Sequence, residues 1–401
     1  MRLWVLAPFA LGLLFALQKP ADDSYVILLT GDMDGLLTPC GCTQPMSGGI
    51  RRLGTAVQSL SAPGRTLMLV NGGLVANASR QDELKAETFA QALKAMNVTA
   101  LKVGRSEMAL GRGAIVSMAN VAGPVLVGSS DVSEFSGGAV PATIKSGDFL
   151  IGAGVRPLEV EDLVRTAKLE GLHPILLLDG GQDGAVKVAE DFPSLALVQY
   201  RSGGRPSKKW VGQTLLASPG EKGKQVVRLV YSKGRFVSYS TTDLGPQYAD
   251  DPTASRILKQ YLTRVGSEHL ADYVPRSETP DFAGTASCGS CHLEAQKVWE
   301  KSGHAHALGT LKKEGEQMDP ECLKCHVVGF ESAKGYTDEL KTRDLASVGC
   351  ESCHGPGKAH SVNPYSVKLP AVTENKCASC HTAEQSPNFQ FPTFWPKVKH
   401  K

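Results

Sequence analysis

Eight cysteines near the C-terminus fall into four pairs with one spacing. The copies are Cys288-Gly-Ser-Cys291-His292, Cys322-Leu-Lys-Cys325-His326, Cys350-Glu-Ser-Cys353-His354 and Cys377-Ala-Ser-Cys380-His381. C-x-x-C-H is the attachment signature of c-type haem. The two thiols add to the two vinyl groups of the porphyrin, and the adjacent histidine binds the iron from the proximal side. The pattern therefore predicts four covalently bound haem c groups, with the four motif histidines as proximal iron ligands.

Zinc sites and redox dithiols also use C-x-x-C pairs and are the alternatives to haem. A zinc site needs four ligands in all and no histidine directly after each cysteine pair. Here four pairs, each followed by histidine, use eight of the ten cysteines. This arrangement favours haem over zinc or disulfides.

The two remaining cysteines, Cys40 and Cys42, form a C-x-C pair near the N-terminus. In an exported protein such a pair can form a disulfide, remain as inert thiols, take a redox role coupled to the haems, or bind a metal. Asp32 and Asp34 lie close in the sequence and would allow a mixed metal site. The sequence leaves these alternatives open.

The composition is that of an ordinary soluble protein, and it limits the classes of partner. The chain has 401 residues, of which 42% are apolar and 21% charged, which is enough for two to three domains. A formal charge of +3 without a basic cluster gives no support for nucleic-acid binding. We expect instead redox partner proteins or a small-molecule electron donor or acceptor.

The N-terminus has the pattern of a secretory signal peptide, assigned to residues 1–21. Arg2 precedes an apolar run, Leu3–Leu17, which is shorter than the roughly 20 residues that span a bilayer. We expect a periplasmic or otherwise exported protein, since c-type haem is attached outside the bacterial cytoplasm. Membrane association is expected only if this segment remains uncleaved.

Short apolar runs alternate with helical patterns over residues 24–245, which predicts an α/β (α+β) fold with a buried sheet flanked by helices. The expected strands are Tyr25–Thr30, Thr66–Asn71, Ala100–Val103, Pro124–Gly128, Phe149–Gly152, Pro174–Leu178 and Leu195–Gln199, followed by antiparallel strands within Lys209–Ser218 and Lys224–Thr242. The expected helices are Gln81–Met96, Leu158–Glu170 and Ala185–Asp191. Residues 246–281 are expected to be a linker that contains a helix, Ile257–Leu270.

A series of short motifs in this first domain resembles a known family. They are Gly31-Asp-Met-Asp-Gly35, Pro39-Cys-Gly-Cys42, Gly48-Gly-Ile-Arg-Arg52, Leu69-Val-Asn-Gly-Gly73 and Val103-Gly-Arg-Ser-Glu107. Their order is similar to that in the metallophosphoesterase domain of bacterial 5′-nucleotidases. The resemblance implies a phosphoesterase-like sandwich.

The same resemblance argues against phosphatase activity, because most of the family's metal ligands are absent. The family's opening Asp-x-His reads Asp32-Met-Asp34 here, and its bridging Asp falls at Leu74. Its Asn-His pair becomes Arg105-Ser106, and its later histidines fall near Gly180 and Ser202. A di-metal site needs carboxylates and imidazoles, so we expect this domain to be inactive as a phosphatase.

Residues 282–401 are expected to enclose the haems in a small, mainly α, loop-rich domain. The pieces Trp299-Glu-Lys-Ser-Gly-His304, Cys322-Leu-Lys-Cys-His-Val-Val-Gly-Phe330 and Val348-Gly-Cys-Glu-Ser-Cys-His-Gly-Pro-Gly-Lys-Ala-His360 resemble the cytochrome c-554 family of tetrahaem electron carriers. That resemblance covers the last third of the chain. It implies that His304, His360 and His400 are distal iron ligands.

His306 is either a fourth distal ligand or a surface residue. If it is free, one haem is five-coordinate, as the resemblance implies for one of the four, and we assign that state to the haem at His326. An open iron position suits the binding of a small molecule, whereas two histidines suit electron transfer.

The expected function is thus an exported tetrahaem cytochrome c that carries electrons between redox partners. One alternative is a multihaem oxidoreductase acting on a small nitrogen, sulfur or oxygen species at a five-coordinate haem. Another alternative is a haem-linked phosphoesterase.

Overall fold

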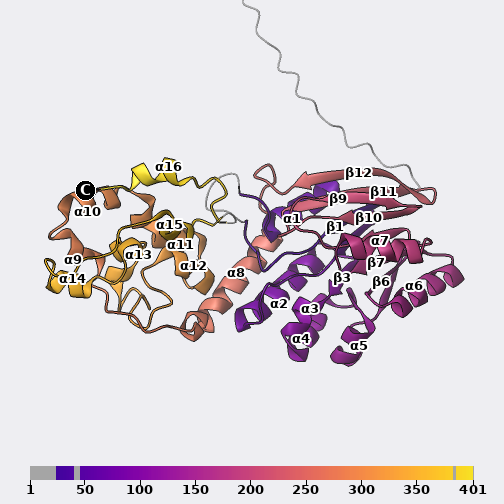
Figure 1. Cartoon of the computed structure of the whole chain (residues 1–401). Helices are drawn as coiled ribbons and strands as arrows, with labels where there is room; N and C mark the ends of the chain where they lie inside the picture. Colours follow the sequence, from indigo (N-terminus) through magenta and orange to yellow (C-terminus); the bar gives the residue numbers. More distant parts are fainter. Residues whose placement is uncertain (1–23, 40–45, 383–384, 401) are drawn as a thin grey trace, which may run out of the picture.

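The computed structural model describes residues 24–39, 46–382 and 385–400. The expected signal peptide and the pair Cys40 and Cys42 lie outside the described residues. The chain forms a larger part built on two β-sheets and a smaller part of short helices and loops, with helix α8 (Pro252–Ser267) between them (Figure 1).

The first sheet has the strand order β12-β11-β1-β2-β3-β4. Its strands are β1 (Tyr25–Thr30), β2 (Thr66–Val70), β3 (Ala100–Val103), β4 (Leu126–Gly128), β11 (Gln225–Ser232) and β12 (Arg235–Asp243). Strands β1 to β4 are parallel, while β11 and β12 are antiparallel and are joined by a tight hairpin. The sheet therefore joins a parallel half made early in the chain to a hairpin made late.

The second sheet has the order β5-β6-β7-β8-β10-β9. Its strands are β5 (Thr143–Ser146), β6 (Phe149–Gly154), β7 (His173–Leu178), β8 (Leu197–Gln199), β9 (Ser207–Val211) and β10 (Thr214–Ser218). The inner strands are parallel, and the two edge strands β5 and β9 pair antiparallel with their neighbours.

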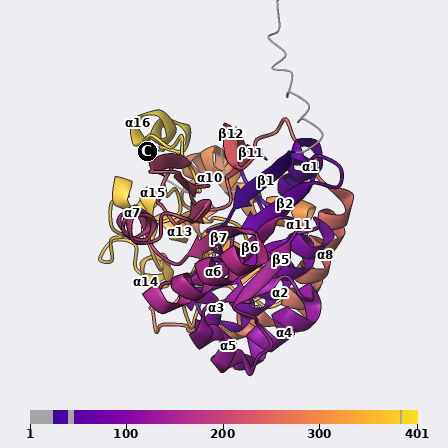
Figure 2. The ribbon, with the colours of Figure 1, turned by 90° about the vertical axis from the view of Figure 1, so that its right-hand side faces the viewer.

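The two sheets pack face to face, because alternate residues of their strands point into a shared apolar layer. In β1, Ile27 and Leu29 are buried in this layer, whereas Val26 and Leu28 face the helices on the outer side. Helices α1 (Ile50–Leu60), α2 (Arg80–Ala95), α3 (Arg105–Ala109), α4 (Arg112–Ala122) and α5 (Ser130–Ser136) belong to the first half, and α6 (Pro157–Glu170) and α7 (Gln182–Asp191) to the second. Figure 2 shows the sheets with helices on both outer faces.

Helix α8 belongs physically to this larger part although it lies within the expected linker. Ala254, Ile257, Leu258, Tyr261 and Val265 are buried in the core beneath the first sheet. Asp251 caps the helix by accepting the amide of Ala254 at 2.7 Å. Helix α8 is therefore a packed element of the larger part, and it leads the chain to the smaller one.

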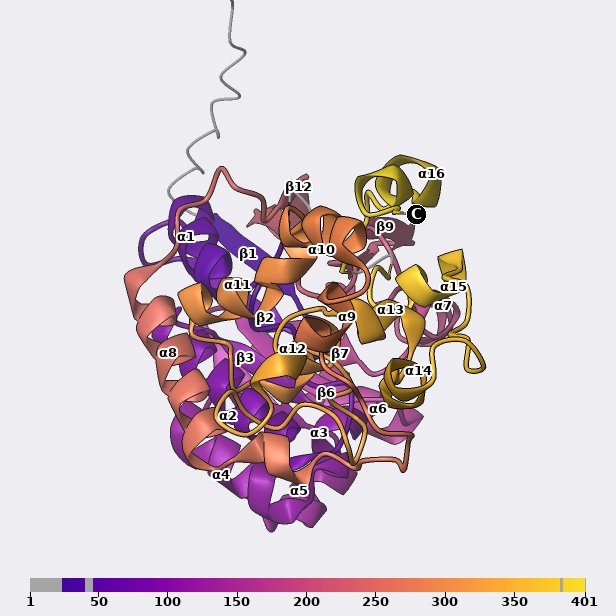
Figure 3. The same ribbon diagram turned by 90° about the vertical axis from the view of Figure 1, so that its left-hand side faces the viewer.

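The smaller part consists of short helices joined by loops (Figure 3). They are η1 (Leu270–Tyr273), α9 (Thr285–Gly289), α10 (Leu293–Glu300), η2 (Gly303–His306), α11 (Ala307–Glu314), α12 (Pro320–His326), η3 (Arg343–Leu345), α13 (Cys350–His354), α14 (Lys358–Val362), α15 (Glu374–Ala378), α16 (Phe391–Phe394) and η4 (Trp395–Lys397). Its apolar cluster is small and centres on Leu308, Leu323, Val328 and Phe330. Among the described residues beyond Leu345, no apolar side chain is buried. The protein chain alone therefore supplies little interior to the last segment.

The predicted fold class, an α/β sandwich followed by a mainly helical, loop-rich region, is confirmed. The sequence pattern located most buried strands, but it did not predict helices α1, α3, α4 and α5 or strand β5. Strand β4 begins at Leu126, two residues after the predicted start.

Candidate haem-binding region

Each C-x-x-C-H motif lies on or directly after one helical turn. Helices α12 and α13 contain the whole second and third motifs, while α9 and α15 contain the first cysteine of the other two. In those two motifs the histidine amide closes a helical turn, with His292 N to Cys288 O at 3.0 Å and His381 N to Cys377 O at 2.9 Å. Residues three and four apart lie on one face of a helix, so the turn presents both thiols and the following imidazole to one side.

Three motif histidines face a histidine from another segment. The ring centroids of His292 and His360 are 6.2 Å apart, at an interplanar angle of 27°. Those of His381 and His304 are 6.0 Å apart, and those of His354 and His400 are 5.8 Å apart. Each pair joins one motif histidine to one of the three expected distal histidines.

This separation fits a metal ion between the two rings. Two imidazoles that bind opposite sides of one metal, at the usual nitrogen–metal distance of about 2 Å, place their ring centroids roughly 6 Å apart. Direct stacking of two rings does not require this distance, and two of the three pairs are steeply inclined, by 49° and 56°. The pairs are therefore suited to hold an iron from both sides.

Hydrogen bonds leave one nitrogen of several of these rings available to a metal. His360 Nδ1 lies 2.7 Å from the carbonyl of Val367, and His400 Nδ1 lies 3.0 Å from that of Val398. A carbonyl can only accept, so Nδ1 carries the proton and Nε2 is left with a lone pair. A hydrogen bond from Nδ1 to a backbone carbonyl is typical of a histidine whose Nε2 ligates a metal.

Burial favours the neutral form of the paired rings. It lowers the pKa of His304, with His381 and His326 contributing further, and it also lowers the pKa of His354 and His381. Neutral imidazole is the form that binds a metal, so the environment suits ligation.

His326 differs from the other motif histidines. Its Nδ1 lies 2.8 Å from the carbonyl of Ala307, which again leaves Nε2 free. Among the described residues, no histidine ring makes a ring contact with it. His306 is exposed at the start of α11 and takes part in no such pair within the same described set. The structure thus brings together three of the four expected distal candidates and leaves His306 apart.

The four motifs are linked by contacts between their thiols. The Cys288 thiol lies beside that of Cys350 and lowers its pKa to about 7. The Cys325 thiol lies beside that of Cys380 and lowers its pKa to about 6. Cys353 also lies near enough to Cys377 for their charges to interact. The motifs therefore follow one another in space in the order first, third, fourth, second.

Glu351, between the cysteines of the third motif, is buried and was not singled out in the sequence. Its carboxylate accepts the amides of Ala283 at 2.7 Å, Gly284 at 2.8 Å and Gly357 at 2.6 Å. These bonds tie the loop before the first motif to the loop after the third. Burying a carboxylate is costly unless hydrogen-bond donors such as these three amides satisfy it. The donors come from distant segments, so no local pattern in the sequence reveals the role of Glu351.

In the larger part, the aspartates that follow β1 and β7 form ion pairs. Asp32, which follows β1, lies 2.5 Å from Arg201 Nε, and Asp179, which follows β7, lies 3.4 Å from Lys102 Nζ. Burial raises the pKa of Asp32 to about 6, although Arg201 and Lys102 oppose the shift. Burial also acts on Asp179, but Lys102 and Arg201 lower its pKa overall. Arg201 and Lys102 are thus the cations that face Asp32 and Asp179.

The positions expected to have lost metal ligands do not rebuild a metal site. Leu74 is buried in the core, and Arg105 is directed to Asp179 at 3.8 Å. The hydroxyl of Ser202 bonds that of Ser218 at 2.7 Å. Among the described residues, no group of three or more His, Cys, Asp or Glu side chains is arranged to hold a metal ion. The residues present do not fit the family's two metals.

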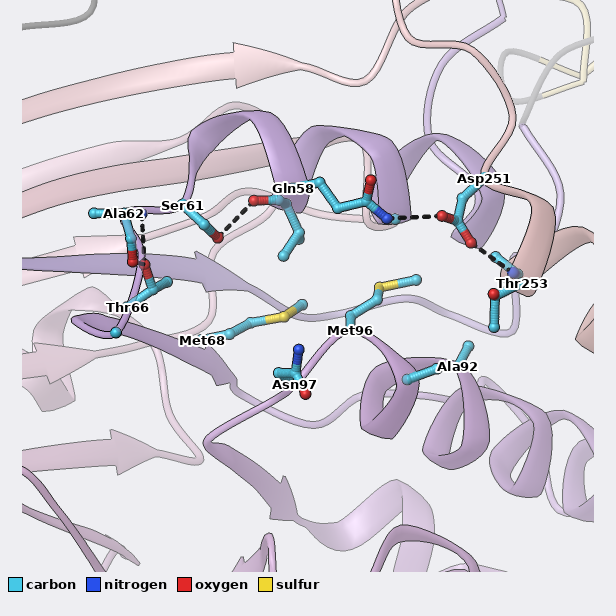
Figure 4. Close-up of a pocket in the computed structure, with 15 residues that line it drawn as sticks. Gln58, Ser61, Ala62, Thr66, Met68, Ala92, Met96, Asn97, Asp251 and Thr253 are labelled. Carbon is cyan, nitrogen blue, oxygen red and sulfur yellow. Dashed lines mark hydrogen bonds between the residues drawn. The ribbon is translucent and has the colours of Figure 1, made fainter. Parts of the chain in front are cut away.

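A pocket of about 530 Å³ lies between α1, the start of α8 and the end of α2. Its main polar side chains bond to one another, as Figure 4 shows: Gln58 Nε2 donates to Asp251 at 2.9 Å, and Asp251 caps α8. None of its lining residues belongs to a cysteine motif, so the pocket is separate from the candidate haem-binding residues. Within the part of the chain that the structure describes, no helix is both long and apolar enough to cross a membrane.

The comparison with protein families bears on the region of the histidine pairs. Residues 287–355 match the family of cytochrome c554 and c-prime. Cytochrome c-554 of Nitrosomonas europaea is 40% identical over 92 residues, covering 19% of this chain and 39% of that protein. The C-type polyheme cytochrome OmcB of Geobacter sulfurreducens is 27% identical over 124 residues, covering 29% of this chain and 15% of that protein. The resemblance of the C-terminal region to the cytochrome c-554 family is thereby confirmed.

These matches cover well under half of the relatives' own lengths. They support a multihaem c-type cytochrome in electron transfer, with covalently bound haem c. These matches do not give the number of haems or the ligands of each iron.

The larger part is similar to solved 5′-nucleotidase structures. A 5′-nucleotidase precursor from Thermus thermophilus aligns with a TM-score of 0.52 at 14% identity, covering 73% of this chain and 68% of that one. NAD nucleotidase from Haemophilus influenzae aligns with a TM-score of 0.51 at 11% identity, covering 65% and 64%. At such identities the likeness shows the fold alone. The resemblance of the N-terminal domain to this fold is confirmed, and its activity is a separate question.

Proposed function

We propose that this chain is a tetrahaem c-type cytochrome that relays electrons between redox partners outside the cytoplasm. The observation that carries the proposal is the set of three histidine pairs, each with ring centroids 5.8 to 6.2 Å apart. Each haem would be attached through the two cysteines of its motif. Bound haem supplies the chemistry, which is the reversible uptake of one electron at iron.

The protein residues would set the state of each iron. His292 with His360, His354 with His400, and His381 with His304 would form six-coordinate, low-spin sites that change little on reduction and favour rapid transfer. The motif histidine His326 would bind the fourth iron alone, which leaves one position open.

The thiol contacts support an order for the relay. Neighbouring motifs would place the haem at His292 beside that at His354, followed by those at His381 and His326. Electrons could pass along this series without large motions of the protein. Partner proteins or a small-molecule donor or acceptor would exchange electrons at its ends.

The domain assignment follows from the same proposal. Residues 1–21 would direct export to the periplasm, and 24–245 would form the phosphoesterase-like domain without phosphatase activity. Residues 246–281, whose helix α8 packs onto that domain, would lead the chain to residues 282–401, which would carry the haems. The ion pairs of Asp32 and Asp179 support the loss of the phosphatase metals.

A spectropotentiometric titration combined with EPR of the mature holoprotein tests this function. We expect four haems per chain, three low-spin ferric signals and one high-spin signal. A protein without a Soret band, or with zinc bound to the motif cysteines, would refute the proposal.

A second candidate is an oxidoreductase that acts on a small nitrogen, sulfur or oxygen species at the haem of His326. The lack of a described ring partner for His326 favours it. If it is right, nitric oxide or hydroxylamine should alter the high-spin EPR signal and leave the three low-spin signals in place. A high-spin signal insensitive to both ligands would count against this candidate.

A further inference from the structure

The larger domain makes direct polar contact with the loop that precedes the second cysteine motif. Gln81 on α2 donates from Nε2 to Asp319 Oδ1 at 2.8 Å and to the hydroxyl of Tyr261 at 2.9 Å. The Tyr261 hydroxyl, on α8, lies 3.4 Å from the other oxygen of Asp319. All three side chains are buried. Two helices of the phosphoesterase-like domain thus enclose one carboxylate of the haem region.

Asp319 fixes the start of the helix that bears the motif. Its side chain accepts the amide of Glu321 at 2.9 Å and so caps α12. Its backbone carbonyl accepts the amides of Cys322 and Leu323 at 3.1 and 2.9 Å. Because α12 spans only Pro320 to His326, holding the residue that caps it also holds Cys322, Cys325 and His326.

A second contact brings a charge. Lys85 on α2 donates to both oxygens of Glu321, at 2.7 and 2.6 Å. The Lys85 side chain is 5% exposed and that of Glu321 is 47% exposed. A buried ammonium requires such a partner. The larger domain therefore holds a cation against Glu321, the residue that precedes the first haem-binding cysteine of this motif.

That cation lies near three carboxyl groups. The Cys322 thiol is near the carboxylates of Glu316, Asp319 and Glu321, and Lys85 is the cation that acts against them there. Negative charge close to a haem stabilises the ferric form and lowers the reduction potential, while positive charge does the reverse. Lys85 therefore opposes the effect of the carboxylates on the haem attached here.

We propose that the phosphoesterase-like domain serves to position and tune the single haem bound by Cys322, Cys325 and His326. Gln81 and Tyr261 are positioning residues that hold α12 through Asp319. Lys85 raises the reduction potential of this haem relative to the value that the carboxylates alone would set. The proposal rests on the proposed function, because it requires haem at the second motif.

The domain thereby gains a role without any phosphatase chemistry. The contact lies at the one motif whose histidine has no ring partner among the described residues. Asp32 and Asp179 pair with Arg201 and Lys102 within the larger domain itself. Helix α2 contributes Gln81 and Lys85 to the contact with the haem region.

Two substitutions with opposite expected signs test the proposal in the full-length holoprotein. Lys85→Met keeps the length of the side chain and removes the charge, so the midpoint of the high-spin haem should move to a more negative potential. Glu321→Gln removes one carboxylate, so the same midpoint should move to a more positive potential. In both variants the midpoints of the three low-spin haems should remain as in the wild type.

Lys145→Met is the matched charge control, because Lys145 forms an exposed pair with Glu170 at 2.9 Å elsewhere in the larger domain. It should leave all four midpoints unchanged. Tyr261→Phe tests positioning without a charge change and should broaden or divide the high-spin EPR signal alone. Tyr273→Phe removes the same hydroxyl from an exposed side chain and should leave that signal intact.

The outcomes separate this inference from the function on which it rests. The inference would be overturned if the wild type carries four haems and the high-spin haem has the same midpoint in Lys85→Met and in Glu321→Gln. The electron-relay function would then still stand. A common shift of all four midpoints, or shifts of the same sign in both variants, would overturn the inference as well. Wild-type protein without haem would refute the proposed function itself.

Discussion

Glu351 gives the most direct test of how the haem region is held together. Its buried carboxylate accepts three backbone amides at 2.6 to 2.8 Å, from segments before the first motif and after the third. Hydrogen bonds to a charged group contribute about 1.5–3 kcal/mol each, and a buried donor left without a partner is costly. Loss of this side chain should therefore destabilise the region strongly.

The two oxygens allow a graded prediction. Oε1 accepts the amides of Ala283 and Gly357, and Oε2 accepts that of Gly284. Glu351→Gln can keep the first two bonds but turns an amide donor toward Gly284, so we expect a loss of about 2 kcal/mol in the free energy of unfolding. Glu351→Leu loses all three bonds, and we expect about 4 kcal/mol, less than a simple sum because the bonds are coupled.

Guanidinium unfolding of the holoprotein, followed by circular dichroism in the Soret band, measures both values as shifts of the midpoint at constant slope. Glu374→Gln, an exposed carboxylate in the first turn of α15, is the control and should leave the midpoint unchanged. If both Glu351 variants unfold within about 0.5 kcal/mol of the wild type, the carboxylate does not hold these loops together and the reasoning fails.

Further outcomes follow from the histidine pairs and the ion pairs. His304→Ala should convert the haem at His381 from low to high spin, giving a second high-spin EPR signal; an unchanged spectrum would contradict the pairing. Because burial raises the pKa of Asp32 to about 6, the folded state binds the proton more tightly than the unfolded state, and the free energy of unfolding should fall as pH rises from about 4 to about 6, by about 3 kcal/mol. Asp32→Asn should remove this slope in urea unfolding curves. Added Mn²⁺ should leave the melting temperature of the wild type unchanged, since Asp32 and Asp179 already pair with Arg201 and Lys102; a rise would indicate a retained metal site.

The sequence predicts what is local in the haem region. The C-x-x-C-H spacing fits within one helical turn, so the attachment residues and proximal histidines can be proposed without knowledge of the fold. The pairing of His292 with His360, or of His354 with His400, joins distant segments and depends on the path of every loop between them. The same holds for the three amides that meet Glu351.

In the larger domain, burial decided which elements could be located. Strands such as β1 and β7 are buried on both faces and therefore appear as continuous apolar runs. Strand β5 lies at a sheet edge with its residues exposed or half-buried, and its polar sequence Thr-Ile-Lys-Ser gives no such signal. Helix α8 was expected in a linker, because a single sequence does not show which core its apolar face joins.

The contact between the domains could not be predicted from the sequence either. Lys85 has the pattern of an ordinary surface lysine on an amphipathic helix, and only the fold shows that it is buried against Glu321. The role proposed for Lys85 depends on its contact with Glu321, which lies far away along the chain.

The absence of buried apolar side chains among the described residues beyond Leu345 bears on the order of events in biogenesis. A segment without an apolar interior of its own would gain little free energy by folding before haem is attached. The later cysteine pairs would then stay accessible to the ligation machinery until the last thioether bond has formed. Maturation and folding of this segment would be a single process, and a chain made without porphyrin would remain a substrate for proteases.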